Sequence, residues 1–256
     1  MIGALLLAQT IAVTGGTVYP VSGPKIANGT VLIRDGNIAA VGANVTIPSG
    51  ATRIDATGKW VTPGLIDGGG QMGLVEINAV RGTREGALAS DTVAAAFNVA
   101  EGINPASALI PVTRIEGITT ALAAPDGHLI SGQAVLIDLD GATIEQMVVK
   151  SPVAIVARLN EDVKDEAGGS RAGVAQRLRR VFGDALEYGR RKGDYGRAQI
   201  QPLAAPAADL EALLPVLRGE LPLIAVANRK SDIETALRIG REYKLKLILE
   251  IGRAHV

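Results

Sequence analysis

Two polar residues lie where predicted strands give way to loops, and both could take part in acid–base chemistry. Asp67 ends a predicted strand within the stretch VTPGLIDGGGQMGL, and His128 follows the sequence PDG after another. Histidine is the side chain that most often transfers protons near neutral pH, and a carboxylate can orient a ligand or a second group. Each residue also has a structural alternative, Asp67 as a turn residue and His128 as an ordinary loop residue.

The residue types that most often bind transition metals are scarce. The chain contains no cysteine and two histidines, His128 and His255. The lack of cysteine excludes disulfides, iron–sulfur clusters, zinc fingers and thiol catalysis. The small number of histidines severely limits any metal site built from imidazole groups.

Charge and composition argue against polyanionic partners. The 26 basic and 26 acidic residues give a net charge of zero, and aromatic residues make up only 3%. We therefore expect neither a basic surface for nucleic acid or an anionic membrane nor a platform that stacks bases. No run of about 18 apolar residues is present, so we expect no transmembrane segment. A small-molecule substrate or ligand is the expected partner, and a homo-oligomer stays open.

Both ends of the chain carry segments that we expect to lie outside the folded domains. Residues 1–9, from Met1 to Gln9, resemble the remnant of a signal peptide, although its positively charged start is missing. Export, for example to a periplasm, is one expectation, and a cytoplasmic protein is the alternative. Residues 251–256, IGRAHV, match the translation of a common sequencing adapter. We expect them, His255 included, to be an artefact at the end of a truncated gene.

Residues 10–62 predict a small β domain. Short β-rich runs alternate with turn sequences that contain glycine, proline and asparagine. Asp35-Gly36 predicts a tight hairpin, because these residues supply the positive φ angles that such a turn needs. We expect this segment to form a β-sandwich or a barrel.

Residues 63–250 predict strands that alternate with helices. The expected helices cover residues 92–100, 143–149, 171–191, 207–218 and 231–243, the first capped by Ser90-Asp91 and the last starting with a capping box at Ser231. Near-continuous apolar strands between helices are typical of a parallel sheet. A complete (β/α)8 TIM barrel needs about 250 residues, so we expect an incomplete barrel.

The stretches GTVLIRDGNIAAVG and IDATGKWVTPGLID, followed by the α/β region, resemble the amidohydrolase superfamily. The likeness is greatest to imidazolonepropionase-like amidohydrolases and spans residues 11–250. It implies a composite β-sandwich domain followed by a TIM barrel. It also implies hydrolysis of non-peptide C–N bonds, for example in a cyclic amide, by water that one or two divalent metal ions such as zinc activate.

The resemblance also locates the metal ligands, and this chain departs from the family pattern there. The two histidines that follow PGLID in the family fall on Gly69 and Gln71, and a later His-Ala-His-Arg stretch starts at Val226 and places its second histidine on Asn228. Glycine and valine offer no side-chain ligand, and an amide is a poor ligand for zinc. We therefore expect a degenerate metal site, in which Gln71 and Asn228 are candidates to bind a polar ligand.

Two functions stay open at this point. The first is a hydrolase of non-peptide C–N bonds with altered chemistry, for which Asp67 and His128 are the candidate catalytic residues. The second is a catalytically inactive protein of the same fold that binds a small ligand or a partner. The loss of histidine at the ligand positions favours the second, and the family framework favours the first.

Overall fold

The computed structural model describes residues 9–196 and 203–252. The chain divides into two compact units, residues 1–64 and 65–256. Apart from Gln9, the expected signal-peptide remnant lies outside the described residues, as do His255 and the rest of 253–256. None of the helices in the described ranges is long and apolar enough to cross a membrane.

The described strands of the first unit form one mixed sheet. Strand β1 (Thr10–Val18) pairs antiparallel with β2 (Ile26–Arg34), which pairs antiparallel with β3 (Asn37–Gly42). On its other side β1 runs parallel to β4 (Thr52–Asp55) and to the short strand β5 (Trp60–Val61). The β-rich segment expected from the sequence is therefore a single sheet of five strands in this part of the chain.

The turn between β2 and β3 has the predicted conformation. Asp35 and Gly36 have φ angles of 51° and 76°. Arg34 and Asn37 face each other as the last pair of the hairpin. The two positive φ angles match the right-handed twist of the flanking strands, so the hairpin prediction is confirmed.

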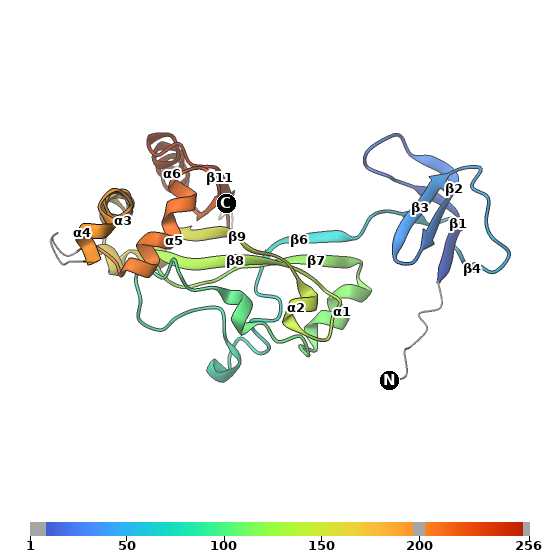
Figure 1. Cartoon of the computed structure of the whole chain (residues 1–256), viewed down its shortest axis with the longest axis horizontal. Helices are drawn as coiled ribbons and strands as arrows, with labels where there is room; N and C mark the ends of the chain where they lie inside the picture. The colour runs from blue at the N-terminus through green and yellow to red at the C-terminus, as the bar shows by residue number, and fades with distance from the viewer. Residues whose placement is uncertain (1–8, 197–202, 253–256) are drawn as a thin grey trace. The chain divides into compact units, whose positions relative to one another are not determined.

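A six-stranded sheet forms the frame of the second unit (Figure 1). The strands lie in the order β11-β10-β9-β8-β7-β6. Their bounds are β6 (Leu65–Gly70), β7 (Ile118–Ala123), β8 (Ile130–Asp138), β9 (Val148–Arg158), β10 (Leu223–Val226) and β11 (Leu247–Glu250). The sheet curls, so that its two edge strands approach each other. A Cβ atom on Gly69 of β6 would lie 3.9 Å from the carboxyl carbon of Glu250 on β11.

One strand runs against the others, which corrects the expectation of an all-parallel sheet. Strand β8 is antiparallel to both β7 and β9, whereas the other neighbouring strands are parallel. The connections explain this direction. Residues 124–129 and 139–147 join β8 to its neighbours, and a parallel crossover needs a dozen or more residues.

Helices lie along both ends of this sheet. In Figure 1, α3, α5 and α6 lie near β9 to β11, and α1 and α2 lie near β7. The bounds are α1 (Leu109–Ile115), α2 (Ile144–Met147), α3 (Arg171–Arg190), α4 (Lys192–Gly196), α5 (Ala207–Leu217) and α6 (Lys230–Glu242). Short 3-10 helices are η1 (Arg81–Thr83), η2 (Val99–Gly102), η3 (Glu161–Val163) and η4 (Asp165–Ala167). The long helix expected at 171–191 is confirmed.

Two local predictions about helices are wrong. The segment 92–100 is irregular up to η2, because its backbone bonds to the rest of the unit. Ala94 donates its N–H to the carbonyl of Ile130, and Ala96 donates to the buried carboxylate of Asp209 over 2.8 Å. The capping box at Ser231 is also absent, since α6 already begins at Lys230. In segment 92–100, tertiary partners have overridden a favourable local pattern.

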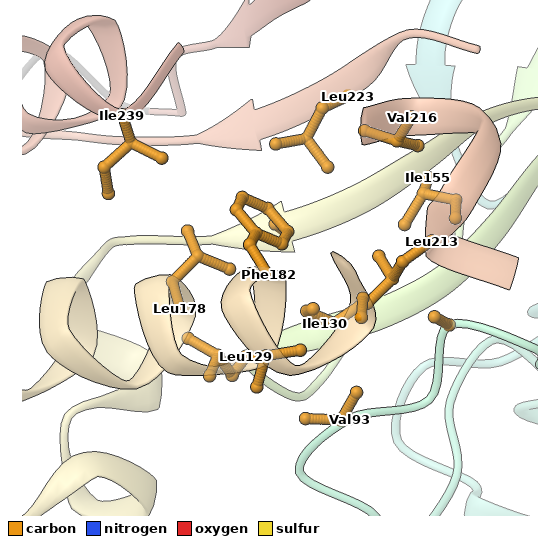
Figure 2. Close-up of a cluster of buried hydrophobic side chains, with 14 of the residues drawn as sticks. Val93, Leu129, Ile130, Ile155, Leu178, Phe182, Leu213, Val216, Leu223 and Ile239 are labelled. Carbon is orange, nitrogen blue, oxygen red and sulfur yellow. The ribbon is translucent and has the colours of Figure 1, made fainter. Parts of the chain in front are cut away.

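The main core lies between the sheet and three helices. Phe182 of α3 is fully buried, and its ring meets the ring of Tyr243 edge to face, with centroids 5.2 Å apart. Figure 2 shows Phe182 surrounded by Leu178 of the same helix, Leu213 of α5 and side chains of β9 and β10. Edge-to-face packing of this kind adds to the free energy gained by burying the rings.

Alternation along the strands divides the sheet into two faces. Ile155 and Ala157 of β9 belong to the core against the helices. Ala154 and Val156, one residue out of phase, belong to a separate apolar cluster that also contains Val226. Since successive side chains of a strand point to opposite faces, Arg158 at the end of β9 shares the face of Val156.

Candidate functional site

The carboxyl ends of the parallel strands surround a small hollow, which we call the strand-end pocket. It has a volume of about 170 Å³. Its walls come from the ends of β6, β7, β9 and β11, and its lining residues are Gly69, Gly70, Gln71, Ala124, Pro125, Asp126, Arg158 and Glu250. The end of a barrel that bears the carboxyl ends of its strands is where barrel proteins bind and transform ligands.

Among the described residues that line this pocket, the guanidinium group of Arg158 is the only cation. Its side chain is 14% exposed and forms an ion pair with Asp126, while a second carboxylate, that of Asp162, lies 3.6 Å away. The Nε atom of Arg158 is buried and has no hydrogen-bond partner among the described residues. Two carboxylates therefore hold the cation in place and leave part of its donor capacity unused.

Glu250 supplies a carboxylate at the same level of the sheet. Val226 of β10 is the register partner of both Arg158 on β9 and Glu250 on β11, so the two charged residues flank it on one face. Glu250 forms no ion pair within the described ranges. Because Gly69 has no side chain, the carboxylate of Glu250 can approach the end of β6.

The residues at the expected ligand positions lie in different surroundings. Gly69 and Gln71 line the strand-end pocket. A Cβ atom on Gly86 would lie 2.8 Å from Nε2 of Gln71, so the amide rests against the Gly86 backbone. Val226 is buried in the apolar cluster below the pocket, and Asn228 follows β10. The structure thus brings the first two positions to the pocket and leaves Val226 in the core.

Asp67 forms a short local contact rather than a long-range one. Its carboxylate accepts the N–H of Gly69 over 3.2 Å. A side chain that bonds to the backbone two residues further on is typical of a turn. This contact shapes the end of β6, where Gly69 and Gln71 lie.

Several buried polar atoms near the strand ends have no partner in the described part of the chain. They are Oδ1 of Asn160, Oδ1 of Asn228, Oδ2 of Asp232 and Nε of Arg158. The amide nitrogen of Asn160 donates to Asp162 over 2.7 Å, which leaves its oxygen as a free acceptor. Native proteins pair most buried polar groups, so unpaired ones suggest a water molecule or a ligand nearby.

These residues do not fit the divalent metal that the family pattern implies. Among residues 9–196 and 203–252, no group of three or more His, Asp or Glu side chains could hold a metal ion. Gly69 offers no ligand atom, and the guanidinium of Arg158 already carries a positive charge into the same pocket. Arg158 already engages the carboxylate of Asp126, which leaves Glu250 as the one described carboxylate of the lining that is free to bind a metal ion.

His128 lies in a hydrogen-bonded cluster beside the pocket, which we call the His128 latch. The Nδ1 atom faces Oε1 of Glu166 at 2.7 Å, and Nε2 faces the carbonyl oxygen of Leu88 at 2.8 Å. The second oxygen of Glu166 accepts the N–H of Leu129. Both ring nitrogens therefore face acceptors, and only the imidazolium form can donate to both.

The electrostatic surroundings agree with this geometry. Burial of the ring opposes protonation, but the hydrogen bonds to Glu166 and Leu88 and the negative charges of Glu166 and Asp91 outweigh it. Together they raise the pKa of His128 above its ordinary value. Both ring nitrogens of His128 face hydrogen-bond acceptors. The His128 latch therefore holds the loop around Leu88 in place.

The latch predicts that stability depends on pH. Since the pKa of His128 is higher in the folded state, its contribution is fully present below the unfolded pKa of about 6.5 and is lost as the pH rises through the folded pKa. Glu166→Gln should lower the free energy of unfolding by about 1.5–3 kcal/mol at acidic pH and by less at alkaline pH. Urea unfolding across the pH range measures this, and an equal loss at every pH would contradict it.

A second hollow, which we call the arginine pocket, adjoins the first. It has a volume of about 310 Å³, and Arg81 and Arg84 are among its lining residues. Leu88 of the latch also lines it. Gln71 and Asp126 line both pockets, so the two hollows meet at these side chains.

The sequence pattern did not single out several residues of this site. Arg158 and Glu250 are the last residues of two strands, and Asp126 lies in the loop that contains His128. Their positions could have identified Arg158 and Glu250, because polar residues at the carboxyl ends of barrel strands lie at the functional face. The pairing of Asp126 with Arg158 leaves no signal in residue spacing.

Comparison with known proteins shows which fold this chain shares. No protein-family profile matches the chain. An amidohydrolase from Thermotoga maritima has a similar structure, with a TM-score of 0.81 and 26% identity over 93% of this chain and 63% of that one. The chain therefore has the fold class expected from the sequence. A β unit is followed by a second unit that matches part of an amidohydrolase barrel.

Curated sequences agree at the level of the superfamily. The amidohydrolase tasK of Hapsidospora irregularis is 23% identical over 86% of this chain, which corresponds to 25% of its own length. Dihydroorotases of Pelotomaculum thermopropionicum and Anaeromyxobacter dehalogenans are 52% and 38% identical over 58 and 61 residues, or 13% and 14% of their lengths. This chain thus spans a quarter or less of these relatives. It is a member of the amidohydrolase superfamily.

Proposed function

We propose that this amidohydrolase-fold protein binds a small polar ligand in the strand-end pocket through charged side chains. The observation that carries the proposal is the guanidinium of Arg158, held by Asp126 in the pocket where the family pattern implies a metal. Guanidinium groups bind carbonyl and carboxylate oxygens with fixed geometry. A concave site with a few convergent polar groups is the usual form of a small-molecule site.

The resemblance to imidazolonepropionase-like proteins suggests a class of ligand. A cyclic amide carries a carbonyl oxygen and an N–H group side by side. Arg158 could donate to the first, and Glu250 could accept from the second, because both line the pocket. Ligand recognition by such a pair needs no group beyond those that the chain supplies.

A hydrolase of non-peptide C–N bonds is the second candidate. The structural similarity to the amidohydrolase of Thermotoga maritima and the sequence similarity to tasK favour it. This chain spans 63% of the first relative and 25% of the second, so their activity is a proposal for this chain. The absence of a matching ligand set at Gly69, Gln71 and Val226 counts against the usual form of this chemistry.

A ligand screen with a turnover assay separates the two candidates. Cyclic amides, ureides and acylated amino acids are tested for their effect on the melting temperature, since a ligand that binds only the folded state raises it. Compounds that bind are then incubated with the protein, and released amine or acid is measured. Binding without turnover supports the proposal. Rapid turnover would support the hydrolase instead, and no binding by any compound would contradict both.

A further inference from the structure

Charged side chains without partners lie in both pockets, and their signs differ. Glu250 lines the strand-end pocket, and Arg81 and Arg84 line the arginine pocket. Within the described ranges, none of the three side chains forms an ion pair or a hydrogen bond. The other charges of the lining, Arg158 and Asp126, pair with each other.

The two pockets therefore form one polar site with a separation of charge. Its acidic part contains Glu250, its basic part contains two arginines, and the paired charges lie where the hollows meet. The amide of Gln71 also lies at this junction and can both donate and accept a hydrogen bond. Such an arrangement favours a molecule with opposite charges at its two ends and fixes its direction in the site.

We propose that the two pockets together bind a single dipolar molecule, whose carboxylate lies at Arg81 and Arg84 and whose ammonium lies at Glu250. This inference rests on the proposed function, because the strand-end pocket is the ligand site in both. Arg81 and Arg84 suit a carboxylate, because a guanidinium group donates hydrogen bonds to both of its oxygens. A carboxylate without a protein partner suits a donor that carries positive charge.

Amino acids of increasing length test the proposal without knowledge of the natural ligand. Glycine, γ-aminobutyrate and ε-aminocaproate carry the same two charges at increasing separation. ε-Aminocaproamide lacks the carboxylate, and N-acetyl-ε-aminocaproate lacks the ammonium. Isothermal titration calorimetry should show that one of the longer amino acids binds best. Removal of either charge from the best binder should weaken binding at least about tenfold, as expected for a lost charge-assisted hydrogen bond.

Variants assign each end of the molecule to its pocket. Arg81→Gln combined with Arg84→Gln should remove the preference for the carboxylate, and Glu250→Gln should remove the preference for the ammonium. Arg53→Gln and Glu116→Gln change exposed residues of the same types outside both pockets and should leave binding unchanged.

The possible outcomes separate this inference from the proposed function. Equal binding of the charged and neutralised compounds would overturn the dipolar ligand. Binding that is insensitive to the arginine and glutamate variants would overturn the assignment of its ends. If none of these compounds binds while other compounds of the ligand screen do, the inference fails and the proposed function stands. If no compound of either set binds, both fail.

Discussion

Replacing Phe182 by alanine is expected to lower the free energy of unfolding by about 3–5 kcal/mol, the range for a buried phenylalanine. The ring is fully buried between α3 and the sheet and contacts the ring of Tyr243. Its removal would leave a cavity that Leu178, Leu213 and Leu223 cannot fill without moving the helices or strands that carry them. The loss therefore combines transfer free energy with the cost of the cavity.

Chemical denaturation of the variant and of a matched control measures this effect. Gln176→Ala changes an exposed residue of the same helix and should alter the free energy of unfolding by about 0.5 kcal/mol or less. Phe182→Leu, which keeps much of the volume, should cost less than Phe182→Ala. If Phe182→Ala and Gln176→Ala had equal effects, the described packing of α3 on the sheet would be wrong.

Replacing Arg158 by glutamine should weaken ligand binding at least about thirtyfold, which corresponds to about 2 kcal/mol. The guanidinium is 14% exposed, so a ligand in the pocket meets it with little competing water. Arg158→Lys keeps the charge but not the planar donor geometry and should recover only part of the affinity. The measurement is calorimetric titration of the best compound from the ligand screen.

The control for this variant is a second arginine that pairs with an aspartate. Arg114 pairs with Asp140 at 2.9 Å, and both side chains are exposed. Arg114→Gln should leave ligand affinity unchanged and should have little effect on stability. A folded Arg158→Gln protein with unchanged affinity would contradict the role of Arg158 in the pocket.

Local patterns were sufficient for the elements whose partners are close in sequence. The Asp35-Gly36 turn needs only two positive φ angles, and the apolar stripe of the long helix from residue 171 places Phe182 in the core. Segment 92–100 has an equally helical composition, yet Asp209 and Ile130, far away in sequence, take its backbone hydrogen bonds. Single-sequence patterns contain no information about such distant partners.

The separation in sequence between neighbouring residues also decides which residues of the site could be predicted. The family pattern located Gly69 and Gln71, because that part of the pocket follows directly from the strand at 65–70. Arg158 and Glu250 were not predicted. A charge at the end of a strand also fits a solvated surface, and only the register through Val226 shows that these two residues share a face.

We expect charged side chains, rather than a metal ion, to bind the ligand in the strand-end pocket. The most direct test is to measure the metal content of the purified protein together with the affinity for the best ligand before and after dialysis against EDTA and after addition of zinc. We predict a metal content well below one ion per chain and the same affinity in all three states. One or two tightly bound ions per chain, with ligand binding lost on their removal and restored by zinc, would contradict the claim.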